Sequence, residues 1–280
     1  MKPRTVALLL MATGCITPRD AAGPDPLIEA DYFVESSPEN VSWGWYPIDK
    51  EPVLTIRSGQ TVRINTLTHV GATQDEEPVA YLTGMGIPRE QITQDVLDFW
   101  TSREGRDREG RSAHVITGPI YVESAEPGDM LEIEILEIET RVDWGANNTG
   151  PRGGVFSTSY PGFEEGDPSL DITDARHIIR TGELDGQGLA FFSEDIQVPL
   201  APFMGVMAVA PDPVVGEPGV AQPGIQSSRP PGAFGGNLDV KDLTAGTTLY
   251  LPVFHPGALF YVGDPHSAQG DGEVSGTAIE

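Results

Sequence analysis

One recurring pattern limits what this chain can fold into: a turn containing glycine, followed by residues that alternate between apolar and polar. It occurs in segments 58–64, 127–133 and 245–251. In the second segment apolar and acidic side chains alternate in the order Leu131, Glu132, Ile133, Glu134 and Ile135. This period of two is typical of a strand with one buried face. The spacing between the segments is irregular, which favours a sandwich or barrel over a repeat solenoid.

Composition supports a mainly β fold. Of 280 residues, 33 are glycine and 25 proline, so turns should be frequent and long helices few, while 39% hydrophobic residues allow a core. We predict a sandwich or barrel-like all-β core with one or two short helices. The pattern at 89–100 predicts the clearest helix, and the Pro-bounded run 198–210 predicts a buried strand. We expect loops at 142–154 and 211–231.

The charge balance excludes several classes of partner. A formal charge of -25 argues against binding nucleic acid or an anionic membrane surface through charge. The sequence contains no phosphate-binding loop, dinucleotide fingerprint or nucleophile elbow, so nucleotide and serine-nucleophile chemistry lack support.

The N-terminus predicts export. Lys2 and Arg4 precede the apolar run 6–12, which is too short to cross a bilayer, and Gly14 precedes Cys15, the only cysteine. We predict a signal peptide at 1–15 ending in a lipobox-like cysteine, a flexible tether at 16–29 and one domain at 30–280. The protein would be periplasmic or anchored to the membrane only through lipid on Cys15; an ordinary secretory signal is the alternative.

The stretch 257–273 contains the residues best suited to bind a cation or activate a water molecule. Pro265 biases Asp264 towards extended backbone, in which residues two apart share a face, so Asp264 and His266 could converge on one ion or one water. Asp271 and Glu273 repeat this spacing. Carboxylates with one imidazole suit a divalent cation such as zinc or manganese, which can activate water.

Two interpretations of this stretch remain open. The acidic residues could satisfy their own backbone turns in a glycine-rich hairpin. Three carboxylates held close would, however, repel one another unless a cation or proton lay among them. His69 precedes Gly71 at the end of an expected strand, so its ring could also reach a site at the sheet rim.

Several segments together resemble the acetamidase/formamidase family. They are 114–129, Pro202-Phe-Met-Gly205, 235–239 and 263–273, and 66–71 is similar to a variant in some members. The matches run in order from about Val62 to the last residue. The resemblance implies hydrolysis of short aliphatic amides to ammonia and a carboxylate, on a mainly β fold, with a divalent metal in some members. It also implies that domain 30–280 lacks the family's C-terminal end.

The resemblance and the spacing together predict a metal-assisted amidohydrolase. The expected metal ligands are Asp239, Asp264 and His266, with zinc first and calcium or manganese as alternatives. Glu273 would take the proton from water and pass it to the leaving nitrogen. His69 and Asp271 are second choices, as ligands or as partners of ligands.

A non-catalytic alternative is an exported β-sandwich that binds a cation or carbohydrate, with the acidic loop as a structural calcium site. A catalytic metal keeps one coordination position open towards a pocket, whereas a structural one is closed by protein ligands. The strand-like segment 274–279 would leave an unpaired edge, so association with a second copy of the chain is a further expectation.

Overall fold

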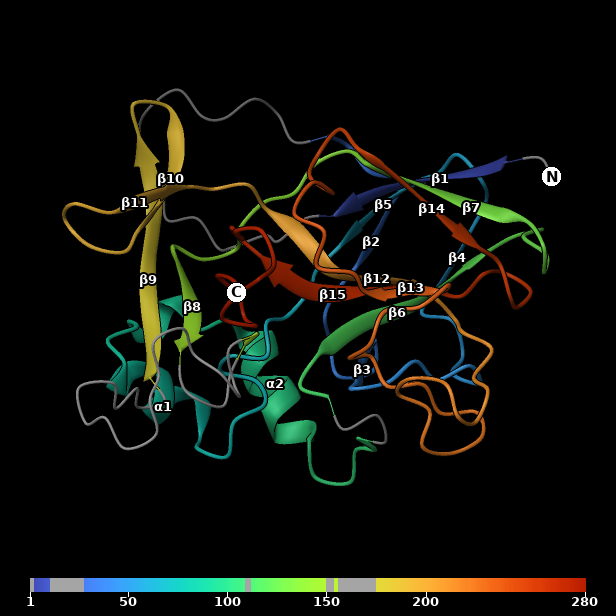
Figure 1. The fold of residues 1–280 in the computed structure, drawn as a ribbon, viewed down its shortest axis with the longest axis horizontal. Helices are drawn as coiled ribbons and strands as arrows, with labels where there is room; N and C mark the ends of the chain where they lie inside the picture. Colours follow the sequence, from blue (N-terminus) through green and yellow to red (C-terminus); the bar gives the residue numbers. More distant parts are fainter. Residues whose placement is uncertain (1–2, 11–27, 109–111, 150–153, 156–174) are drawn as a thin grey trace.

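The computed structural model describes residues 3–10, 28–108, 112–149, 154–155 and 175–280, and these form three β-sheets and two short α-helices (Figure 1). The predicted mainly β fold is confirmed. None of the helices in these ranges is long and apolar enough to cross a bilayer.

The first sheet contains all three segments of the recurring pattern. Its order is β14-β7-β1-β5-β2, with strands at Thr248–Pro252, Met130–Ile135, Pro3–Leu10, Thr61–Ile64 and Tyr32–Val34. In β7 buried and half-buried residues alternate, as the sequence period predicts. Strand β1 lies parallel to both β5 and β7 and separates them.

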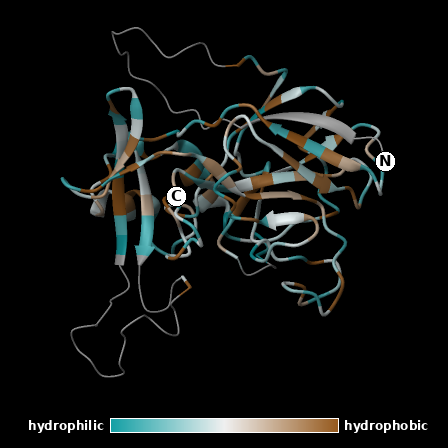
Figure 2. Ribbon diagram, turned by 45° about the horizontal axis from the view of Figure 1, so that its top comes forward, coloured by the Kyte–Doolittle hydropathy of each residue, from teal (hydrophilic) through white to brown (hydrophobic). Residues whose placement is uncertain are grey.

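The second sheet packs against the first and carries the candidate site. Its order is β13-β12-β15-β6-β3, with strands at Gly235–Asn237, Phe203–Val209, Phe260–His266, Val115–Val122 and Val41–Trp43; β4, Leu54–Ile56, also pairs with β6. One apolar cluster joins side chains of β5 and β7 to those of β6, β12 and β15. Figure 2 shows apolar segments along the strands of these packed sheets. All seven residues of β12 are buried, so the predicted strand in 198–210 is confirmed.

A third sheet and the helices lie beside the sandwich (Figure 1). The sheet has the order β11-β10-β9-β8, with strands at Gln197–Pro199, Gln187–Phe191, Ala175–Leu184 and Trp144–Thr149. Helix α1 spans Pro78–Gly84 and α2 spans Gln94–Ser102. The Glu77 carboxylate accepts hydrogen bonds from the first-turn amides of Val79 and Ala80, which fixes where α1 begins.

The helix predicted at 89–100 is interrupted. Residues Arg89–Gln91 form a 3₁₀ turn, Ile92 is extended, and α2 begins after Thr93. Extended backbone lets Ile92, which is 4% exposed, bury its side chain in a cluster with Leu82 and Trp144. Tertiary packing therefore overrides the helical period at this position.

The loop predicted at 142–154 is wrong over 144–149, which form β8. Its glycine and asparagine residues favour turns, but the Asn147 side chain donates to Ser275 Oγ at 2.9 Å and the Asn148 amide to Thr277 Oγ1 at 2.9 Å. Pairing with β9 and with this distant segment holds the strand. Neither partner can be identified from local sequence.

The structure describes the first part of the predicted signal peptide but not the part that contains Cys15. The backbone of residues 3–10 forms β1 inside the first sheet, whereas Cys15 and residues 16–27 of the predicted tether lie outside the described residues. Export and lipid attachment stay predictions. If processing removes residues 1–14, β5 and β7 lose the strand between them.

Candidate active site

Three neighbouring strands bring the first acidic residues together. Strand β12 pairs with β13 on one side and β15 on the other, and Gly205 in β12 lies between Asp264 of β15 and Asp239, two residues beyond β13. The amide of Asp239 donates to Gly205 O at 3.2 Å. Residues far apart in sequence thus meet across one central strand.

Gly205 is the residue that permits this approach. A Cβ atom placed there would lie 2.6 Å from Asp264 Oδ2 and 2.7 Å from Asp239 Oδ1, closer than real Cβ atoms come to other heavy atoms. Any larger residue would therefore displace both carboxylates. This gives a physical role to the Pro202-Phe-Met-Gly205 motif.

The backbone at the site is held in an unfavourable conformation. Asp239, Asp264 and Glu273 have φ angles of 48°, 55° and 41°, in the left-handed region that L-residues seldom adopt. The expected extended backbone at Asp264 is therefore wrong, although β15 continues to His266. Strain of this kind persists where surrounding structure enforces it, and it concentrates at functional sites.

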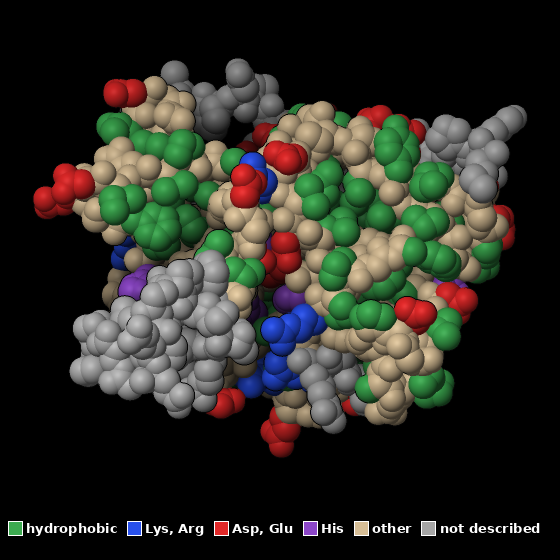
Figure 3. Space-filling model, viewed as in Figure 1, with side chains coloured by type: hydrophobic (Ala, Val, Ile, Leu, Met, Phe, Trp, Pro, Cys, Tyr) green, Lys and Arg blue, Asp and Glu red, His purple; other side chains and the backbone are tan. Residues whose placement is uncertain are grey.

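The site contains two groups of side chains that could hold a cation. We call Asp239, His266 and Glu273 the Asp239 group, and His69, Asp264 and Glu280 the Asp264 group. Within each group, one ligand atom from every residue lies within 4.8 Å of the others. The groups adjoin, because His266 Nε2 is 3.5 Å from Asp264 Oδ2, and His114 Nε2 approaches the same oxygen at 3.8 Å. Figure 3 shows acidic and histidine side chains together in a hollow on this face, with basic side chains beside them.

Gln269 orients His266 within the Asp239 group. His266 Nδ1 lies 2.9 Å from Gln269 Oε1, and Gln269 Nε2 donates to Asp239 O at 2.7 Å. An amide oxygen can only accept, so Nδ1 carries a proton. When a cation displaces the second ring proton, the lone pair that binds it lies on Nε2, the nitrogen that faces the carboxylates.

The Asp264 group is assembled by the end of the described chain. Ala146 of β8 and Glu280 exchange two backbone hydrogen bonds, at 2.6 and 3.0 Å. The Glu280 carboxylate pairs with His69 Nδ1 and accepts a hydrogen bond from Thr68 Oγ1 at 2.7 Å. This carboxylate is almost fully buried, so it is fixed beside Asp264.

Burial and charge shift the pKa values in opposite directions. Burial and the Asp264 charge raise the pKa of Asp239 to about 6, and burial and the Asp239 charge raise that of Glu273 to about 8. Burial alone would lower the pKa of His266, but Asp264 outweighs it and raises the value to about 10. Asp264 itself keeps a pKa well below its usual range, because the surrounding histidines outweigh its burial.

One buried atom indicates that this cluster fits a cation. Asp239 Oδ1 is buried and has no hydrogen-bond partner among the described residues. An unpaired carboxylate oxygen costs free energy in such a place unless a proton or cation binds it. Carboxylates with one imidazole nitrogen are a donor set that zinc and manganese accept.

The structure brings most of the predicted site residues together. Asp239, Asp264, His266, Glu273 and His69 all belong to one of the two groups. Asp271 lies apart: its side chain is 93% exposed and pairs with Lys241 Nζ at 3.3 Å. Sequence reasoning missed Glu280, which has no local pattern, and gave no role to His114, whose position at a strand end was its only signal.

Comparison with known proteins identifies the family. The profile of the Acetamidase/Formamidase family matches residues 101–218 and 216–280. The chain belongs to the acetamidase/formamidase family. It is 30% identical over 207 residues to a formamidase of Methylophilus methylotrophus and 29% identical over 220 residues to an acetamidase of Mycolicibacterium smegmatis. Each alignment covers 62% of this chain, but only 50% and 52% of those relatives, so the chain spans about half their length.

A solved structure has the same fold. The crystal structure of an acetamidase from Bacillus halodurans matches with a TM-score of 0.59 and 30% identity, covering 88% of this chain and 66% of that one. The fold of this chain is therefore similar to one already known from an acetamidase.

Proposed function

We propose that this chain carries the hydrolytic site of an amidohydrolase, which splits a linear amide into ammonia and a carboxylate with the help of a divalent cation. The observation that supports this most directly is the pair of adjoining ligand groups built around Gly205, in a member of the acetamidase/formamidase family. Relatives that carry these names match this chain along most of its length.

Asp239, His266 and Glu273 would hold or face the cation, with Asp264 and His69 beside them. When bound, a divalent cation supplies Lewis acidity, which favours ionisation of water and polarises an amide carbonyl. Zinc suits the donor set best, and manganese and calcium are the alternatives that the titration below separates.

Glu273 is suited to moving the proton. Its side chain is half-buried, and burial and the Asp239 charge raise its pKa to about 8 in the cation-free protein. A bound cation would lower this pKa towards the neutral range, in which a carboxylate can both accept and return a proton. It would take a proton from the water that attacks the carbonyl carbon. It would return the proton to the nitrogen as the carbon–nitrogen bond breaks, since an amide nitrogen leaves only when protonated.

Two neighbouring acidic residues give a matched test. Asp264→Asn keeps the size of the side chain but removes a buried charge, whereas Asp271→Asn removes an exposed one. We expect Asp264→Asn to lose ammonia release from amides together with bound cation, and Asp271→Asn to keep both. Equal activity in the two variants would contradict the proposal. Cation binding without any ammonia release in the unsubstituted chain would favour the structural-cation alternative.

A further inference from the structure

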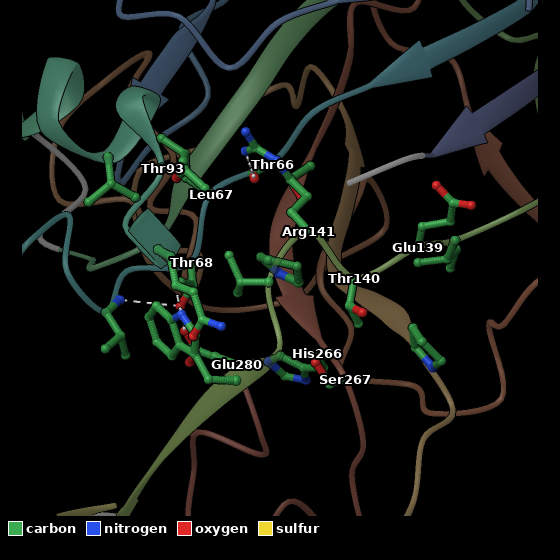
Figure 4. A pocket seen from close by; sticks show the side chains of 18 of the residues that line it. Thr66, Leu67, Thr68, Thr93, Glu139, Thr140, Arg141, His266, Ser267 and Glu280 are labelled. Carbon is green, nitrogen blue, oxygen red and sulfur yellow. Dashed lines mark hydrogen bonds between the residues drawn. The ribbon is translucent and has the colours of Figure 1, made fainter. Parts of the chain in front are cut away.

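A cavity lies directly against both ligand groups. It has a volume of about 90 Å³, and its wall includes His266 of the Asp239 group and Glu280 of the Asp264 group (Figure 4). A single water needs roughly 10–15 Å³ of such space, so the cavity can take several atoms of a ligand. That is more room than the acyl part of formamide or acetamide requires.

Away from these two residues the wall is mostly apolar. It is formed by side chains of α1, α2, β8, β12 and the segments beside them: Leu67, Val70, Leu82, Ile92, Val96, Ile138, Val142, Trp144 and Met204. Several of them pack into one cluster, so the wall has a fixed shape. An apolar wall contributes to binding only when the ligand presents hydrocarbon to it.

Several polar groups of this wall have partners within the protein. The Arg141 guanidinium forms an ion pair with Asp95 and donates to Thr66 O at 3.3 Å. The Trp144 indole N–H donates to Gln91 O at 3.3 Å. The end of the cavity that His266 and Glu280 form, next to the two ligand groups, offers partners for the polar atoms of a ligand.

We infer that the substrate is an amide with a larger apolar acyl group, a hydrocarbon chain of about four to six carbons or a phenyl ring, rather than formamide or acetamide. This inference rests on the proposed function and specifies its substrate. The acyl group occupies the cavity, and the carbonyl and nitrogen face His266. Val142 determines the specificity, because it is a half-buried wall residue whose size can be changed without opening the fully buried core.

The test compares acetamide, butyramide, hexanamide and benzamide as substrates of the full chain loaded with zinc. Each methylene that enters the cavity should raise kcat/KM about fourfold, so hexanamide should exceed acetamide by on the order of 10²-fold. Val142→Phe, which fills the cavity, should lower kcat/KM for hexanamide at least about tenfold and change acetamide little. Val142→Ala should not show this loss. Val214→Phe, on a side chain that is 58% exposed and outside the cavity wall, is the control.

Calorimetric titration with hexanamide separates this inference from the proposed function. If no amide is hydrolysed but hexanamide binds and Val142→Phe weakens its binding, the cavity assignment stands and the proposed function fails. If acetamide or formamide is the best substrate, or if Val142→Phe affects acetamide and hexanamide equally, the inference is overturned. Absence of both hydrolysis and binding of hexanamide also overturns it.

Discussion

The Asp239 group and the Asp264 group differ in where their residues come from. The first takes all three from the last part of the chain: Asp239 follows β13, His266 ends β15 and Glu273 lies in the segment after it. The second joins His69, near the beginning, to Glu280 at the end, and it forms only when β8 pairs with the last residues. Local spacing can therefore reveal the first group, whereas the second exists only through tertiary pairing.

The two groups also differ in access. Asp264 and Glu280 are 5% and 8% exposed, while Asp239 and Glu273 are half-buried. A substrate can reach the more exposed group, and the buried group can set its charge and position. We therefore propose that proton transfer belongs to the Asp239 group, that Asp264 helps to hold the cation, and that His69 and Glu280 have a supporting role; the following predictions test that division.

The largest effect should come from Gly205→Ala, because its Cβ would collide with a carboxylate of each group. We expect loss of bound cation and of measurable ammonia release, with the β fold retained by circular dichroism. Gly84→Ala, where a Cβ meets no atom within 4 Å, is the matched control and should behave like the unsubstituted chain. Normal activity of Gly205→Ala would show that the two carboxylates need not approach.

Replacing Glu273 or Glu280 by glutamine, one at a time, separates the contributions of the two groups to activity. Glu273→Gln should keep the cation but lower kcat by about 10²–10⁴-fold, the usual contribution of a general acid–base residue. Glu280→Gln removes only a supporting partner and should cost about 10–100-fold. Steady-state ammonia assays and metal analysis check both variants. A larger loss in Glu280→Gln than in Glu273→Gln would reverse the assignment.

A smaller effect is expected at Gln269, which fixes the His266 ring. Gln269→Leu should weaken cation affinity by about 10–100-fold, because the imidazole loses the acceptor that holds its tautomer. Gln269→Glu keeps an acceptor at Nδ1 and should retain more of that affinity. Cation titration of both variants is the measurement. Identical affinities in the leucine and glutamate variants would argue against a role in orientation.

The smallest effect concerns the stability of the cation-free protein. Glu273 and Asp239 hold protons in the folded state up to pKa values of about 8 and 6, above their ordinary 4.5 and 3.8. Their contribution to stability therefore falls as pH rises through that range. The stabilising charge of His266 is complete below 6.5 and is lost as pH rises towards 10. Tm should thus decrease from pH 5 to pH 9 in chelator-treated protein, and less so with zinc bound.

Features of the fold and of the candidate site that depend on nearby residues could be predicted from the sequence. The alternating residues 131–135 correctly predicted a half-buried strand, because a period of two reports burial on one face. Asp264 and His266 do lie close together, as their spacing predicted, although they belong to different ligand groups and the backbone at Asp264 is left-handed instead of extended. That conformation is imposed by neighbouring strands, and Pro265 alone predicts the opposite.

Other features could not be predicted because their causes lie far away in sequence. Strand β8 forms from turn-favouring residues because β9 and segment 275–280 pair with it. Glu280 enters the site through that same pairing. The expected helix is interrupted at Ile92, because extended backbone there lets its side chain pack into a cluster beside the cavity. Each case is tertiary packing prevailing over local preference.

The most direct test of the central claim is a titration of cation-free full-length chain with zinc, manganese or calcium, recording bound metal and ammonia release from the same samples. We expect the chelated protein to release no ammonia and its activity to return in proportion to bound metal, with zinc restoring most. We expect no such recovery in Asp264→Asn. Full activity in a preparation shown to contain no metal would contradict the central claim.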